Sequence, residues 1–177
     1  MPGAGQENVK NVFVIYGRNE RAKRAMYEFL RAIGLNIVEW EQAAAFTKEG
    51  SPFVGEILAA AFKVSKAVVV LLTGDDEARL REDYFSENDP EFEKILIPQP
   101  RQNVLFEAGM AFGLQRKRTI LVELGTLRAF SDVMGRYSIR LDNSSAKRNE
   151  LAQRLKSIGC DVHLEGNDWL FAGNFTF

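Results

Sequence analysis

Cysteine and histidine are nearly absent from the 177-residue chain, which contains one of each, Cys160 and His163. A single cysteine excludes an internal disulfide and a zinc site made of several thiolates. It also favours a reducing, cytoplasmic location. The chain has neither a phosphate loop ending in Gly-Lys-Ser/Thr nor a Gly-x-Gly-x-x-Gly run after its first apolar segment. These absences exclude the two commonest nucleotide-binding motifs.

Neither sign of charge is in excess, because 23 Lys and Arg residues stand against 24 Asp and Glu residues. Binding to nucleic acid without sequence preference needs a basic surface, so we expect no nucleic-acid partner. The longest stretch without a charge is nine residues, 169–177, which is too short to cross a membrane. We therefore expect no membrane contact within this chain. What the chain does contain is 46% hydrophobic residues, enough for a folded core.

The apolar residues alternate between two patterns along the chain. Continuous apolar runs rich in β-branched residues predict strands buried on both faces; they span residues 11–16, 35–38, 67–72, 119–122 and 136–141. Helical spacing predicts helices between them, at residues 20–33, 52–62, 104–114 and 146–158. This alternation predicts a flavodoxin-like α/β fold, with about five parallel strands and helices on both faces. Ligands bind such sheets where the strand order reverses, here after Tyr16 and Leu72.

We predict three segments. Residues 1–9 form a flexible N-terminal segment or a cloning remnant, and residues 10–159 form the domain. Residues 160–177 form an aromatic tail that either packs on the domain or leads to a further, sensor domain. The connection 74–100 is long for a strand-to-helix loop, and loops of this length are usually functional or mobile.

Glu107 is the most informative polar residue. Every other residue from 104 to 112 is apolar or glycine, a pattern that predicts a helix buried on all sides. A buried carboxylate costs free energy unless it is paired or faces a cleft. Glu107 therefore either pairs with an arginine, such as Arg18 or Arg101, or belongs to a ligand site. Asn103 lies one helical turn earlier on the same face.

Other candidate ligand residues follow the strands. Gly17 permits a tight turn after the first strand, and Arg18 either binds phosphate or simply begins a helix at the surface. Thr73 and Asp75 follow the third strand and either bind ribose hydroxyls or cap a helix.

Ser51 and Phe53 precede the second predicted helix. A serine at a helix N-terminus favours an anion, although an ordinary helix cap explains Ser51 equally well. An exposed Phe53 could stack on a base.

Four motifs in this order resemble the TIR domain, and more closely a bacterial TIR-like group described as predicted nucleotide-binding proteins. They are Val-Phe-Val-Ile-Tyr-Gly-Arg-Asn (12–19), Gly-Leu-Asn-Ile-Val-Glu-Trp-Glu (34–41), Ala-Val-Val-Val-Leu-Leu-Thr-Gly-Asp-Asp (67–76) and Pro-Arg-Gln-Asn-Val-Leu-Phe-Glu-Ala-Gly (100–109). The resemblance covers roughly residues 10–142. It implies the TIR fold and an effector of bacterial anti-phage immunity.

The resemblance also implies an activity, cleavage of the nicotinamide–ribose bond of NAD, with NAD as substrate and with no cofactor or metal. Glu107 matches the family's catalytic glutamate. The candidate substrate-binding residues are Tyr16, Gly17, Arg18, Trp40, Ser51, Phe53, Thr73, Asp75, Arg101 and Asn103. Animal relatives often carry an aromatic residue one turn before the glutamate, where this chain has Asn103, so Trp40 or Phe53 would take its place. The product is either ADP-ribose or a cyclic form.

The resemblance further implies self-association, in which the BB loop of one subunit, residues 43–53 here, completes the site of the next. A fused or separate cyclic-nucleotide sensor is an expected partner. Nicotinamide leaves a cationic pyridinium as a neutral molecule, so one carboxylate suffices where other glycosidases need two. Two alternatives remain open: a non-catalytic TIR scaffold, and an enzyme like the nucleoside deoxyribosyltransferases, in which Glu107 would be a covalent nucleophile.

Overall fold

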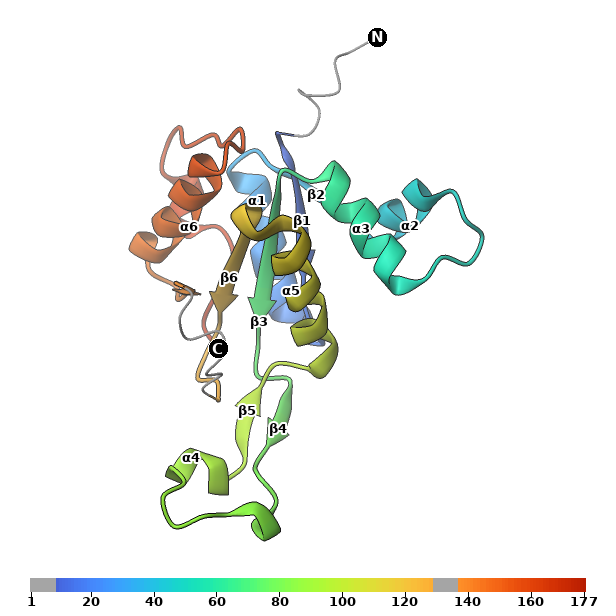
Figure 1. Ribbon diagram of the computed structural model, residues 1–177. Helices are drawn as coiled ribbons and strands as arrows, with labels where there is room; N and C mark the ends of the chain where they lie inside the picture. The colour runs from blue at the N-terminus through green and yellow to red at the C-terminus, as the bar shows by residue number, and fades with distance from the viewer. Residues whose placement is uncertain (1–8, 129–136) are drawn as a thin grey trace.

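The computed structural model describes residues 9–128 and 137–177, and a parallel five-stranded sheet lies at its centre (Figure 1). The strands are β1 (Asn11–Ile15), β2 (Asn36–Val38), β3 (Ala67–Leu72), β6 (Thr119–Glu123) and β7 (Ile139–Arg140). They lie in the order β2-β1-β3-β6-β7, and each neighbouring pair is parallel. This order confirms the predicted flavodoxin-like α/β fold, with its reversal of strand order between β1 and β3.

Helices cover both faces of this sheet, again as predicted. On one face lie α1 (Glu20–Ala32) and α6 (Ser145–Ser157), and on the other lie α2 (Trp40–Thr47), α3 (Val54–Val64) and α5 (Gln102–Gln115). In β1, Val12 and Val14 contact the α1 layer, whereas Phe13 and Ile15 contact the α3 and α5 layer. Successive strand side chains point to opposite faces, so a sheet covered on both sides needs apolar residues at every position.

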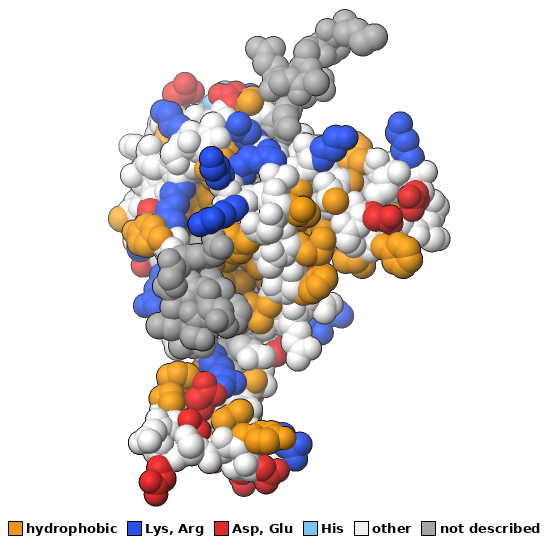
Figure 2. All heavy atoms as spheres, in the orientation of Figure 1, with side chains coloured by type: hydrophobic (Ala, Val, Ile, Leu, Met, Phe, Trp, Pro, Cys, Tyr) orange, Lys and Arg blue, Asp and Glu red, His pale blue; other side chains and the backbone are white. Residues whose placement is uncertain are grey.

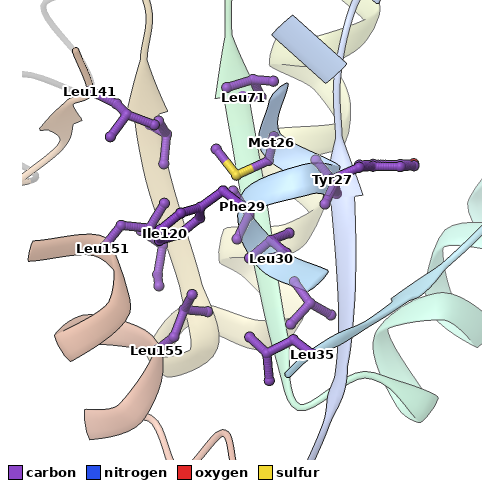
Figure 3. Packing of buried hydrophobic residues seen from close by; sticks show 14 of the residues in the cluster. Met26, Tyr27, Phe29, Leu30, Leu35, Leu71, Ile120, Leu141, Leu151 and Leu155 are labelled. Atoms are coloured by element: carbon purple, nitrogen blue, oxygen red, sulfur yellow. The ribbon is translucent and has the colours of Figure 1, made fainter. Parts of the chain in front are cut away.

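The α1 layer contains the larger of the two cores, and Figure 3 shows part of it. Phe29 from α1 points toward Ile120 of β6 and Leu151 of α6. Gly34 and Gly159 follow these two helices with φ of +81° and +93°. Glycine adopts this left-handed conformation without strain, and both glycines stand directly after the ends of their helices.

The prediction that the helix around Glu107 is buried on all sides is wrong. α5 buries Val104, Ala108 and Ala111, whereas Phe106 is 66% exposed and Leu114 is also exposed. The physical reason is that α5 belongs to an outer layer, so that only the stripe of residues facing the sheet is covered. The apolar residues on its other side form part of the molecular surface.

The segment 43–53, predicted as a loop, begins inside α2. The Glu39 amide donates a hydrogen bond to the Gln42 side chain (3.2 Å) at the start of this helix, and Lys48 ends it with φ of +62°. Alanines at positions 43–45 have high helix propensity, a signal that the prediction did not use. The loop that remains between α2 and α3 consists of residues 48–53.

The long connection 74–100 forms a projecting hairpin rather than an irregular loop. β4 (Asp76–Ala78) and β5 (Ile97–Gln99) pair antiparallel. Between them lie two short helices, η1 (Glu82–Tyr84) and α4 (Glu91–Lys94). Figure 1 shows this hairpin extending beyond the carboxyl end of β3, away from the sheet.

Part of the C-terminal segment contributes to the core. Trp169, in η4 (Asp168–Phe171), and Phe175 are buried in the α1 layer. Arg148 of α6 is 2% exposed, and its guanidinium donates hydrogen bonds to the Ala172 (3.0 Å) and Gly173 carbonyl oxygens. These contacts tie the segment to α6.

The proposed division into residues 1–9, 10–159 and 160–177 stays a prediction, since residues 1–8 lie outside the described part of the chain. Arg136, at the start of the fifth predicted strand, also lies outside it. Within residues 9–128 and 137–177, no helix combines the length and the apolar content that crossing a membrane requires.

Candidate functional site

A pocket of about 240 Å³ lies at the point where the strand order reverses. Five elements bring its walls together: β1 and the residue that follows it, α1, β2, α2 and α5. The lining residues are Phe13, Val14, Ile15, Tyr16, Tyr27, Val38, Trp40 and Glu107. Three of these are large aromatic residues with a polar atom, and Glu107 is the only charged residue among them.

The Glu107 carboxylate has no partner in residues 9–128 and 137–177. It makes no hydrogen bond or ion pair with any residue in the described part of the chain. Burial raises the pKa of Glu107 above its ordinary value, because removing water destabilises the ionised form. A carboxylate that is half-buried, unpaired and next to an open pocket is poised to meet a ligand with positive charge or hydroxyl groups.

The structure does not support the alternative in which Glu107 pairs with an arginine. The Arg101 side chain lies 4.0 Å from Asp76, and the Arg18 backbone amide is bonded to Asp75. Both arginines lie near the ends of β1 and β3, yet neither is among the residues that line the pocket.

Tyr16 and Tyr27 form an aromatic wall of the pocket. Their rings meet edge to face, with the centroids 6.2 Å apart and the planes at 90°. The Tyr27 hydroxyl donates a hydrogen bond to Glu39 (3.2 Å), and burial raises the pKa of Tyr27, so that its phenol stays neutral. The Lys23 ammonium lies 4.6 Å from the centroid of the Tyr16 ring, close enough for a cation–π contact that holds this ring in place.

Asp75 joins the ends of β1 and β3 beside the pocket. Its carboxylate accepts hydrogen bonds from the Arg18 backbone amide (2.5 Å) and from the Thr73 hydroxyl (2.7 Å). Gly17 makes this approach possible, because a Cβ atom at position 17 would lie 1.8 Å from an Asp75 oxygen. The turn after Tyr16 is therefore fixed by a residue 57 positions later in the chain.

The residues proposed from the sequence fall into three groups. Tyr16, Trp40 and Glu107 line the pocket. The second group lies beside the pocket, around the hydrogen bonds that Asp75 accepts, and consists of Gly17, Arg18, Thr73 and Asp75. The third group does not line it and consists of Ser51, Phe53, Arg101 and Asn103.

The members of the third group that precede α3 lie on the surface. Phe53 is 80% exposed and immediately precedes α3, so Ser51 is not the cap residue of that helix. The Phe53 amide donates a hydrogen bond to the Glu56 side chain (2.8 Å). The direct ligand roles proposed for this group stay predictions.

Sequence reasoning missed Tyr27. The residue lies on the buried side of α1, and Figure 3 shows its ring reaching toward β1, away from Phe29 and Leu30. The available signal was a phenol on an otherwise apolar helix face, because a buried tyrosine hydroxyl needs a hydrogen-bond partner. Nothing in the local sequence pointed to Glu39 as that partner.

The sheet order β2-β1-β3-β6-β7, with a ligand-sized pocket where the order reverses, defines a flavodoxin-like α/β domain. The chain belongs to the family described as the TIR domain of CAP12/Pycsar effector proteins, which matches residues 11–143. This is a bacterial anti-phage family, so the chain is an anti-phage TIR effector domain. No curated protein matches the chain.

The raised pKa of Glu107 predicts how stability depends on pH. The folded chain keeps this proton to a higher pH than the unfolded chain does, so the free energy of unfolding falls as pH rises between the two pKa values. Glu107→Gln replaces the carboxyl group with an amide that does not ionise, so the free energy of unfolding no longer falls for this reason. We expect the variant to melt at a higher temperature than the parent at neutral pH, with the difference vanishing below the ordinary glutamate pKa.

Thermal unfolding followed by circular dichroism across a pH series measures this difference. Glu28→Gln, an exposed glutamate on α1, is the matched control and should leave the parent's pH dependence unchanged. A Glu107→Gln curve parallel to that of the parent would show that Glu107 is not destabilised by burial.

The close approach of the Asp75 carboxylate to Gly17 predicts that substitutions at these two positions are coupled. Gly17→Ala should destabilise the chain by roughly 1–3 kcal/mol, because the new methyl group overlaps the Asp75 carboxylate. In an Asp75→Ala background the same substitution should cost much less, since the overlapping atoms are gone. Urea unfolding of the two single variants and the double variant measures the coupling.

Gly109→Ala is the control for that cycle. A Cβ atom at position 109 has no neighbour within 4 Å, so alanine should stabilise α5 by about 0.5–1 kcal/mol through its helix propensity. Equal costs of Gly17→Ala in the two backgrounds would show that Asp75 does not fix the turn.

Proposed function

We propose that this domain is an NAD glycohydrolase that cleaves the nicotinamide–ribose bond of NAD. The observation that carries the proposal is the unpaired Glu107 carboxylate in a pocket otherwise lined by aromatic and aliphatic side chains. Membership of an anti-phage TIR family supports it, since depletion of a shared metabolite would suit such an effector.

The pocket suits the reacting end of NAD. Oxidised nicotinamide is a pyridinium cation, and aromatic faces together with a carboxylate are a recurrent way of binding such cations. Tyr16, Tyr27 and Trp40 offer the faces, and Glu107 offers the charge. Dihydronicotinamide is neutral, so the same pocket would favour the oxidised form over the reduced form.

The chemistry needs no proton donor. The bond between ribose C1′ and the pyridinium nitrogen breaks with its electron pair moving to nitrogen, and nicotinamide departs neutral. The ribose then carries the positive charge of an oxocarbenium-like transition state, which Glu107 stabilises electrostatically and through the ribose hydroxyls. Water attacks C1′ and releases one proton, giving ADP-ribose; attack by a nucleophile within the substrate would give a cyclic product.

The cation and the carboxylate reinforce each other. Burial disfavours the ionised form of Glu107 in the free pocket, whereas a cation beside it favours that form. Substrate binding would therefore lower the pKa of Glu107, the residue on which the transition state depends. We add the family's self-association to this proposal, with the exposed loop 48–53 and Phe53 as the contact.

Glu107→Gln tests the function directly. The variant keeps the size of the side chain but loses its charge, so we expect nicotinamide release from NAD to fall about 100-fold or more. Chromatography of nicotinamide released by concentrated parent and variant proteins, side by side, is the measurement. Glu28→Gln, exposed on α1 and outside the pocket, should release nicotinamide at the parent's rate.

Three other outcomes would contradict the proposal. Equal release by parent and Glu107→Gln would mean that the activity belongs to another residue or to a contaminant. No release by either protein, even when the domain is clustered on a support, would favour the non-catalytic scaffold. A glycosyl adduct on Glu107 in the intact mass would favour the covalent mechanism of a deoxyribosyltransferase-like enzyme.

A further inference from the structure

A group of three charged side chains surrounds Tyr27, one of the aromatic residues that line the Glu107 pocket. Charged side chains of both signs occur over the surface that Figure 2 shows, but these three contact a residue of the pocket wall. Glu39 accepts a hydrogen bond from the Tyr27 hydroxyl (3.2 Å). The Arg31 guanidinium and the Lys23 ammonium lie 5.5 Å and 5.7 Å from the centroid of the Tyr27 ring. None of the three charged residues is itself part of the pocket lining in the described part of the chain.

Glu39 is the acid of this group, and its charge offsets the two cations. The Arg31 guanidinium lies 3.8 Å from the Glu39 carboxylate. Lys23 lies 3.6 Å from Glu20, but the Glu20 side chain is 67% exposed, so water screens this pair. Without Glu39, the charges next to Tyr27 would be two cations, and they would oppose the entry of a cationic ligand into the pocket.

The Tyr27 hydroxyl transmits the charge of Glu39 to the pocket wall. A phenol that donates a hydrogen bond to a carboxylate is polarised by it, which makes the ring richer in electrons and more attractive to a cation. Tyr27 is only 7% exposed, so water screens this effect weakly. Burial above all, together with neighbours that include the Glu39 carboxylate, raises the pKa of Tyr27, so the phenol keeps the proton that the hydrogen bond needs.

Glu39 also anchors a second aromatic residue of the pocket. Trp40 follows it directly and begins α2. The Glu39 carbonyl oxygen accepts a hydrogen bond from the Ala43 amide (3.0 Å), and the Glu39 amide donates one to the Gln42 side chain (3.2 Å). The backbone of Glu39 therefore belongs to the first turn of α2, whereas its side chain reaches α1. One residue thus joins the two helices that carry Tyr27 and Trp40 to the pocket.

We propose that Glu39 is a positioning residue that sets the preference of the pocket for a pyridinium cation over a neutral ring of similar size. It acts through Tyr27 and does not touch the ligand. The proposal rests on the function proposed above, since it concerns the same pocket, and it adds a second carboxylate that serves binding of the oxidised nicotinamide ring. Loss of the Glu39 charge should weaken binding of a cationic ring and spare a neutral one. A change in the shape of the wall would weaken both.

Binding of two small probes, in the absence of NAD, measures this preference. The probes are 1-methylnicotinamide, a pyridinium cation, and nicotinamide, a neutral ring of similar size. In NMR titrations the indole N–H signal of Trp40 reports occupancy of the pocket, and that of Trp169, buried in the α1 layer, is the internal reference. In Glu39→Gln we expect the Kd for 1-methylnicotinamide to rise about three- to tenfold, and the Kd for nicotinamide to change by less than about twofold.

Three further variants separate charge from shape. Tyr27→Phe removes the hydroxyl that Glu39 binds, so it should lose part of the preference, and adding Glu39→Gln to it should change the preference less than in the parent. Tyr27→Phe also carries the test should Glu39→Gln not fold. Arg31→Gln removes a cation beside Tyr27 and should bind 1-methylnicotinamide at least as tightly as the parent does. Glu41→Gln, an exposed acid in the first turn of α2 and outside the pocket lining, is the matched control and should bind both probes like the parent. Melting curves establish which variants are folded.

An unchanged ratio of the two Kd values in Glu39→Gln would overturn the proposal. Equal weakening of both probes would also overturn it, because Glu39 would then serve only the shape of the wall. So would a parent that does not prefer the cation, or weaker cation binding in Arg31→Gln. The titrations involve no turnover and leave Glu107 in place. A domain that releases nicotinamide from NAD but keeps its cation preference in Glu39→Gln would retain the proposed function and lose this inference, so the two failures are distinguishable.

Discussion

The site of this domain depends on one carboxylate that has no counter-charge in the described part of the chain. Glu107 is half-buried in an outer helix, has no partner in the described part of the chain and faces aromatic rings. Burying this carboxylate without a counter-charge destabilises the fold. A purely structural role would be served better by a carboxylate paired with an arginine, or by an apolar residue. That cost is recovered when a cationic ligand enters the pocket, because the same low polarity that raises the pKa of Glu107 strengthens its attraction to positive charge.

The rest of the site keeps this arrangement in place. Asp75 ties the turn after β1 to the end of β3, while Lys23 and Glu39 hold the rings of Tyr16 and Tyr27 from the outer side. Asp75, Lys23 and Glu39 are thus each engaged by a neighbouring group, and Glu107 is the charged residue among those that line the pocket in the described part of the chain. Two residues proposed as ligands, Thr73 and Asp75, bond to each other in this structure, and their ligand role stays a prediction.

Sequence patterns predicted the strands and the sheet order well, because strands covered on both faces need apolar side chains at every position, as in 67–72. They predicted the surroundings of α5 poorly. The apolar pattern of the sequence includes Phe106, but it does not show that this side of α5 faces outward and is exposed. The hairpin was not predicted because β4 and β5 have three residues each. Tyr27 was missed because its hydrogen bond to Glu39 depends on how two elements pack.

The central claim is that Glu107 is an unpaired carboxylate that binds a cationic ligand. Carbon-13 NMR titration of the Glu107 side-chain carboxyl tests it most directly, first in the free domain and then with a non-cleavable carbocyclic analogue of NAD. The account predicts a pKa above the ordinary glutamate value in the free domain and a lower pKa with the analogue bound. An ordinary pKa that the analogue leaves unchanged would contradict it.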